Sequence, residues 1–150
     1  MLIPDFTQYS LALFENEKLI YSSDGGGLRP LWDALEKFRD RSGLSLYDKV
    51  MGLAAARLIV LSGIIAEIFT MVASIPAKEF LEETGIRLTA VEFSANILTK
   101  DKSAVCPGEL IALETVDPDA FFRQISALLN QPAYGQIGNI SAHQSLKSIK

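Results

Sequence analysis

Residues 48–62 constrain the fold of this chain more than any other stretch. After residue 49 their one charged side chain is Arg57, and three consecutive alanines at 54–56 favour helix. A helix that is apolar nearly all round must be buried on most of its sides. We therefore predict a central buried helix over residues 48–62. Asp48 and Lys49 would stand at its N-terminus, where unpaired N–H groups and the helix dipole create a polar site.

The segments around this helix predict strands alternating with helices. Two short β-prone runs joined by a three-residue connection predict a hairpin near the N-terminus. A strand, a helix and a strand within about 30 residues predict a parallel βαβ crossover further on. The fold class is therefore α/β with a mixed sheet. The predicted elements are hairpin strands 9–14 and 18–22, a helix from 29 to about 43, a strand 64–73, a helix from 75 to about 84 and a strand 86–93.

Two further helices are predicted near the end of the chain. The first begins at Cys106-Pro107 and runs to about Thr115, and the second has Asp117 as N-cap and Pro118 in its first turn. From residue 131 onwards Gly, Ser, Gln and Asn dominate, and apolar residues are isolated. We expect residues 1–130 to form a single domain and residues 131–150 to be a flexible or partner-ordered tail.

Composition excludes several classes of protein. A net charge of −4 argues against a nucleic-acid-binding surface, which needs clustered Lys and Arg. Arg57 and Glu67 interrupt the apolar region 50–72, so we expect no membrane span. A single cysteine fits a reducing compartment, and the N-terminus lacks the pattern of a secretion signal, so we expect a cytoplasmic protein.

Cys106 is the candidate nucleophile. It precedes Pro107 at the predicted start of a helix, where the positive end of the helix dipole lowers the pKa of a thiol. Lys100, in the loop before it, would add positive charge. Glu109 lies in the first turn of the same helix and is a candidate proton-transfer group. The alternative is that Cys106 is a buried, inert cysteine and Glu109 only complements the dipole.

Two other polar stretches are candidate ligand sites. Asp48 could orient an amine or hydroxyl of a substrate and Lys49 could bind an anionic group, although both also fit an ordinary helix start. Gly26 and Gly27 precede a helix and could offer free N–H groups to a phosphate or carboxylate, with Arg29 beside them. The spacing matches no known phosphate-binding motif, so a flexible connector is the competing interpretation.

Metal chemistry is limited by the number of ligands. The sequence has one His, His143, and one Cys, whereas a zinc site needs three or four His, Cys or carboxylate ligands. The lone His lies in the polar tail, where it is poorly placed to serve a serine triad. We therefore expect no metal and no cofactor.

Four motifs carry a resemblance to a known family. They are Gly-Gly-Leu-Arg-Pro-Leu at 26–31, Asp-Lys-Val-Met-Gly-Leu-Ala-Ala at 48–55, Ser-Ile-Pro at 74–76 with Gly-Ile at 85–86, and Cys-Pro-Gly-Glu at 106–109. On these the chain resembles small, uncharacterised prokaryotic proteins with a cytidine-deaminase-like fold, over about residues 10–125. The resemblance implies a three-layer α/β/α arrangement.

The resemblance does not extend to the known activity. Zinc deaminases begin their central helix with His-x-Glu and the helix after the next strand with Pro-Cys-x-x-Cys. Here the first position would read Asp-Lys-Val at 48–50, and Ala77 and Phe80 would stand where the two cysteines belong. Every zinc ligand and the glutamate that moves protons are missing, so the resemblance implies the fold without deamination.

Two hypotheses of function remain at this level. In the first, the protein binds a small polar or anionic molecule at a pocket formed by Asp48, Lys49, Cys106 and Glu109, with Cys106 as nucleophile if it is an enzyme. In the second, it is a non-catalytic interaction domain, with a homodimer as the simplest assembly. Neither hypothesis involves nucleic acid or a membrane.

Overall fold

The computed structural model of the chain describes residues 5–99 and 103–130, which form one sheet packed against helices. The hairpin, the parallel crossover and both late helices were predicted and are confirmed. In chain order the elements are β1 (Leu11–Glu15), β2 (Lys18–Ser23), α1 (Arg29–Lys37), β3 (Leu44–Met51), α2 (Leu53–Ser62), β4 (Ile65–Ser74), α3 (Ile75–Glu82), β5 (Arg87–Ser94), α4 (Pro107–Glu114) and α5 (Pro118–Leu129).

The sheet is mixed, with strand order β2-β1-β3-β4-β5. β1 runs antiparallel to both of its neighbours, β2 and β3. β3, β4 and β5 are parallel to one another, and α2 and α3 provide the connections between them. The carboxyl ends of three parallel strands therefore lie at one edge of the sheet, which is the edge where α/β proteins most often bind ligands.

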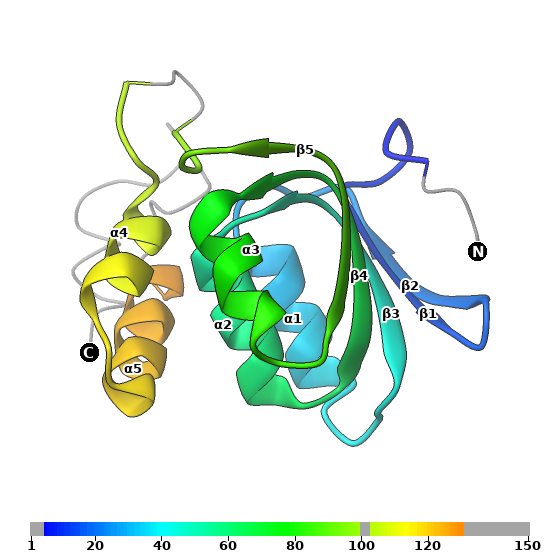
Figure 1. Cartoon of the computed structure of the whole chain (residues 1–150). Coiled ribbons are helices and arrows are strands. Elements are labelled where there is room, and N and C mark those ends of the chain that lie inside the picture. The colour runs from blue at the N-terminus through cyan, green and yellow to red at the C-terminus, as the bar shows by residue number, and fades with distance from the viewer. Residues whose placement is uncertain (1–4, 100–102, 131–150) are drawn as a thin grey trace.

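In the part of the chain that the structure describes, the helices all lie on one side of the sheet (Figure 1). α1, α2 and α3 pack directly on it, and α4 and α5 form a further layer beyond them. One large core joins these layers, with Leu46 and Ile68 from the sheet, Ile59 from α2 and Phe121 from α5 all buried in it. The implied α/β/α sandwich is therefore wrong for these residues, because no described helix covers the other face.

Aromatic side chains fill part of that other face. Phe14 and Tyr47 lie with their ring centroids 4.7 Å apart, and Phe69 lies 5.8 Å from Tyr47. Phe6 and Tyr9, from the segment before β1, pack against this group. The N-terminal segment thus replaces a helix as the cover over the middle of the sheet.

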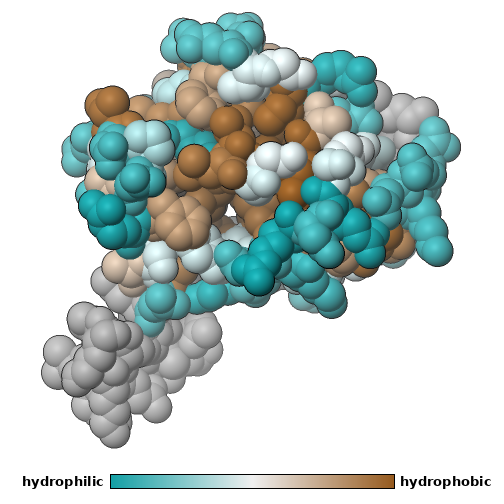
Figure 2. Space-filling model, turned by 90° about the horizontal axis from the view of Figure 1, so that it is seen from below, coloured by the Kyte–Doolittle hydropathy of each residue, from teal (hydrophilic) through white to brown (hydrophobic). Residues whose placement is uncertain are grey.

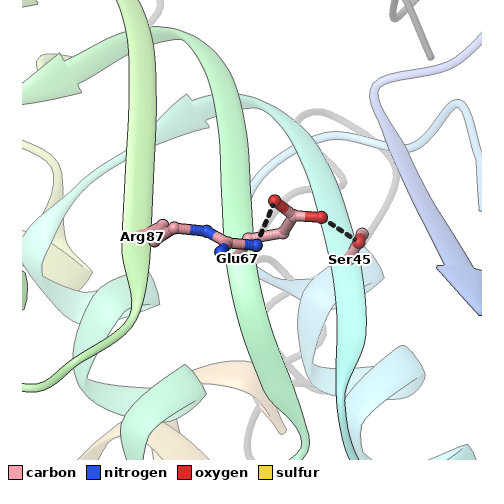
Figure 3. A network of polar contacts seen from close by, with 3 residues as sticks. All are labelled: Ser45, Glu67 and Arg87. Atoms are coloured by element: carbon pink, nitrogen blue, oxygen red, sulfur yellow. Dashed lines mark hydrogen bonds and ion pairs between the residues drawn. The ribbon is translucent and has the colours of Figure 1, made fainter. Parts of the chain in front are cut away.

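A polar row crosses the same face next to the aromatic side chains (Figure 3). The hydroxyl of Ser45 donates to Oε2 of Glu67 at 2.6 Å, and Arg87 donates to Oε1 at 3.0 Å. Both partners favour the ionised carboxylate, so the hydrogen bond from Ser45, followed by the one from Arg87, lowers the pKa of Glu67. The row joins β3, β4 and β5 on a side that remains open to solvent.

The predicted central helix is wrong over its first residues. Residues 48–51 belong to β3, and the helix α2 begins only at Leu53. Leu44 and Leu46 are buried against the helices, and the strand is paired with β1 on one side and β4 on the other. These partners lie far away in the sequence, so the local pattern could not reveal the strand.

The starts of α1, α3, α4 and α5 follow the sequence signals closely, whereas α1 ends at Lys37 and not near residue 43 as predicted. Asp117 caps α5, with its carboxylate accepting from the N–H of Ala120 at 2.8 Å, as predicted. Ser74 caps α3 by accepting from the N–H of Ala77 at 3.2 Å. Within the described ranges, the helices are all too short or too polar to cross a membrane. The predicted tail, residues 131–150, lies outside the described residues.

Candidate functional site

The N-termini of α1, α2 and α4 converge at the carboxyl end of the parallel strands, and we call this region the mouth. It comprises residues 26–29, 52–54 and 106–109. Their proximity follows from Gly108, where a Cβ atom would lie 2.9 Å from Cδ1 of Leu28 and 3.8 Å from Cβ of Ala54. Gly108 is buried, and the absence of a side chain there allows the three helices to approach one another.

Glu109 occupies the N-terminus of α2. It is 4% exposed, and its two carboxylate oxygens accept hydrogen bonds from the backbone N–H groups of Leu53 and Ala54, each at 2.7 Å. A Cβ atom on Gly52 would lie only 2.6 Å from this carboxylate. A carboxylate from α4 therefore caps α2, in the way that an anionic ligand would occupy a helix N-terminus.

Two opposing effects act on the pKa of Glu109. Burial disfavours the charged form, whereas the two backbone N–H groups favour it, and burial prevails so that the pKa is raised. Each oxygen accepts one backbone N–H, so the carboxylate of Glu109 holds the start of α4 against the start of α2. Its catalytic role stays a prediction.

Ser10 links the end of β3 to the glycine loop before α1. Its carbonyl accepts from the backbone N–H of Lys49 at 2.9 Å, and its hydroxyl donates to the carbonyl of Gly25 at 2.6 Å. The structure therefore brings the loop at 24–28 and the Asp48-Lys49 pair to the same edge of the sheet. The side chain of Lys49 is exposed there.

Asp48 faces the helices from within β3. It pairs with Leu11 of β1 and Thr70 of β4, two positions beyond the buried pair Leu46 and Ile68, so alternation turns it toward the helix layer. It retains some contact with solvent. Burial nevertheless raises the pKa of Asp48 to about 7, although backbone N–H groups at 49 and 50 partly stabilise its charge. It is not a helix N-cap, so its comparison with the first zinc-binding motif is wrong.

Cys106 stands at the N-cap position of α4, as predicted, and is half-buried. Its backbone is fixed on both sides, because its N–H donates to Ile97 at 2.9 Å and its carbonyl accepts from Leu110 at 3.1 Å. The thiol itself makes no capping hydrogen bond to the helix. Glu109, three residues later, ties this rigid turn to α2, so the thiol is held at the mouth.

The other predicted ligand residues, which lie in or after the glycine loop, differ in whether they are exposed or engaged in contacts. Gly26 and Gly27 are exposed in the loop before α1, and Gly27 adopts a left-handed φ of 68° that favours glycine. Arg29 is directed to α5, where it donates to the carbonyl of Leu129, and it also lies 3.7 Å from Asp33. Arg29 thus ties α1 to α5, and its role with an anion stays a prediction. Lys100 lies outside the described residues.

A hollow lies at the end of the molecule opposite the mouth (Figure 2). It has a volume of about 250 Å³ and an apolar lining that includes Trp32 and Phe122, whose rings stack with centroids 5.1 Å apart. Its two charged residues, Glu36 and Arg39, pair with each other at 3.7 Å. Nucleophilic chemistry is therefore better supported at the mouth, where Cys106 lies. Within residues 5–99 and 103–130 no three His, Cys, Asp or Glu residues are grouped as a metal site would require.

Sequence reasoning missed the residues that assemble the mouth. Gly52 and Gly108 lie within two of the four sequence motifs and Ser10 lies in none, and the importance of all three residues lies in which segments they allow to meet. The one sequence signal was a glycine directly before an apolar helix, as at Gly52, or within its first turn, as at Gly108. A glycine there permits another segment to approach closely, but the sequence does not show which segment does so.

Comparisons with known proteins agree with the fold. The model of the TM1506 family, a domain of unknown function (DUF1893), matches residues 5–129. A crystal structure of a DUF1893 family protein (TM1506) from Thermotoga maritima at 2.70 Å resolution is similar, with a TM-score of 0.73 and 28% sequence identity. The similarity covers 81% of this chain and 82% of that one. No curated protein is significantly similar in sequence.

Proposed function

The chain belongs to the DUF1893 family, and from that premise we propose that it binds a small anionic or polar molecule at the mouth. The observation that carries this proposal is the meeting of three helix N-termini at the carboxyl end of parallel strands. One of these termini, that of α2, already holds a carboxylate supplied by Glu109. The other two, of α1 and α4, have no side-chain cap.

The charged residues nearby support an anionic ligand. Lys49 is exposed on β3, and its backbone is joined through Ser10 to the loop that opens α1. Asp48 beside it has a pKa near neutrality, which suits a group that exchanges a proton with a ligand. If the site is catalytic, Cys106 is the nucleophile and Asp48 or Glu109 is the proton-transfer group.

The proposal includes a finer description of the fold. A hairpin followed by helix, strand, helix, strand, helix and strand, in the order β2-β1-β3-β4-β5, supports a cytidine-deaminase-like scaffold. Deamination by zinc is not part of it, because one His and one Cys in the whole sequence cannot supply the ligands. The scaffold would keep its ligand-binding edge and use different side chains there.

Titration with inorganic phosphate, followed by backbone amide NMR, tests the binding site. We expect the largest shifts at the amides of residues 26–28 and 108, and an affinity several-fold weaker in Lys49→Ala. The matched control is Lys18→Ala, a strand lysine at the hairpin turn, which should bind as the unaltered protein does. Shifts that are equal over the surface, or an equal loss in the control, would contradict the proposal.

Alkylation of Cys106 tests the nucleophile separately. We expect iodoacetamide to react readily at neutral pH and phosphate to slow the reaction. A rate that rises only above about pH 8, as for an ordinary thiol, would leave ligand binding intact but refute the nucleophilic role.

A further inference from the structure

β5 is an edge strand whose outer side is unpaired in the described part of the chain. The sheet ends at β5, and β4 is the one described strand beside it. Figure 1 shows β5 along the rim of the sheet, with its outer side free of the labelled helices and strands. An edge of this kind presents a row of unpaired N–H and C=O groups, which is a template for pairing with another chain.

β5 has few of the features that normally protect an edge. It is eight residues long, contains no proline, glycine or lysine, and pairs with β4 without a register shift, and its charged residues are Arg87 and Glu92. The opposite edge differs, because β2 is shorter, begins with Lys18 and pairs with β1 through an irregularity between Leu13 and Phe14. The two edges of the same sheet are thus unequally protected.

Apolar side chains are exposed along β5. Leu88 and Ala90 pack against the main core, so alternation turns Val91 to the face without helices. Val91 is 60% exposed and Phe93 is 44% exposed. An exposed β-branched side chain such as Val91 on a weakly protected edge is suited to cross-strand contacts with another strand, whereas the ring of Phe93 has Nζ of Lys78 from α3 above it, 5.9 Å from its centroid.

We propose that β5 pairs antiparallel with β5 of a second copy of this chain, extending one sheet through both. In a pleated antiparallel pair, residues that oppose each other lie on the same face of the sheet. The two-fold axis must therefore lie between the two copies of one residue, which oppose each other. With the axis at Val91, Val91 meets Val91 of the second copy, and Thr89 meets its Phe93. On the helix side Ala90 meets Glu92, so no like charges are opposed.

The inference is independent of the proposed ligand site, because it uses the sheet edge and has its own readout. Sedimentation velocity over a range of concentrations should show a reversible dimer. Val91→Lys places charge at the axis on a side chain that is already exposed, so folding should be retained and the dimer dissociation constant should rise about ten-fold or more. Thermal melting by circular dichroism checks that the variant folds.

The matched control is Val116→Lys, which makes the same substitution at a side chain that is 89% exposed between α4 and α5. It should dimerise like the unaltered protein. A monomer at every concentration, or a Val91→Lys variant that dimerises as well as the control, would overturn the proposal.

Cysteine cross-linking in a Cys106→Ser background tests the register. Val91→Cys should form a disulfide-linked dimer on oxidation, because its two copies face each other at the axis. Thr89→Cys should not, because its copies would lie four residues apart along the strands, about 13 Å, beyond the reach of a disulfide. Cross-linking at 89 but not at 91 would overturn the proposed pairing.

Discussion

Gly52 and the Glu109 carboxylate predict a strong energetic coupling between two residues far apart in the sequence. A Cβ atom at Gly52 would lie 2.6 Å from Cδ and Oε1 of Glu109 and 2.7 Å from Oε2. The backbone of Gly52, with φ −96° and ψ 179°, is extended and accepts any residue. The carboxylate therefore opposes an alanine at this position.

The magnitude follows from the two hydrogen bonds. Each bond from a backbone N–H to the charged carboxylate contributes about 1.5 kcal/mol, so Glu109→Ala should lower the free energy of unfolding by about 3 kcal/mol. Gly52→Ala should cost a similar amount because it displaces the same carboxylate. In the double variant the space is already empty, so the total loss should be about 3 kcal/mol instead of about 6.

Urea denaturation followed by far-UV circular dichroism measures the four free energies of this cycle at neutral pH. Glu114→Ala is the matched control, because Glu114 is an exposed glutamate at the other end of α4 and its loss should cost less than about 0.5 kcal/mol. Additive costs in the double variant, or a Glu109→Ala variant as stable as the control, would refute the reasoning.

Three further substitutions test the energetics. Asp48 has a folded pKa of about 7 against an ordinary 3.8, so the folded state holds its proton more tightly and the free energy of unfolding should fall as pH rises from about 4 to about 7. Urea denaturation across that pH range should show that above pH 7 Asp48→Asn is more stable than the unaltered protein by about 2 kcal/mol. This figure takes half of the free energy of the whole pKa change, because Asp48 is partly exposed. Arg57 donates to the carbonyls of residues 112, 115 and 116, and its guanidinium carbon lies 4.1 Å from the ring centroid of Phe121. In urea denaturation, Arg57→Ala should therefore lower the free energy of unfolding by about 2–3 kcal/mol, and Arg57→Lys should lower it by less. The pKa of Glu67 is lowered in the folded state, so the ionised carboxylate stabilises the fold above about pH 4.5, and this contribution is lost as the pH falls through the folded pKa. In thermal melts the unaltered protein should melt slightly above Glu67→Gln at neutral pH, and the difference in melting temperature should disappear in acid.

Local sequence determined the starts of α1, α3, α4 and α5 and the order of most elements. Asp117 accepts a hydrogen bond from the amide three residues later, and Pro118 occupies the first turn of α5, both as predicted. The prediction was possible because capping depends on groups within a few residues of each other. Cys106 likewise lies at the N-cap position that the following proline indicated. The hairpin and the crossover were predictable for the same reason.

Tertiary structure alone decided what these ends do. Residues 48–51 follow a strand path because β1 and β4 supply hydrogen-bonding partners on both sides, and neither partner is visible in the local pattern. Glu109 reads as an ordinary first-turn acid, yet the fold places it against the N–H groups of another helix and buries it. Hydrogen bonding and desolvation between distant segments, which no local periodicity encodes, thus made a first-turn glutamate of α4 the tie that shapes the mouth.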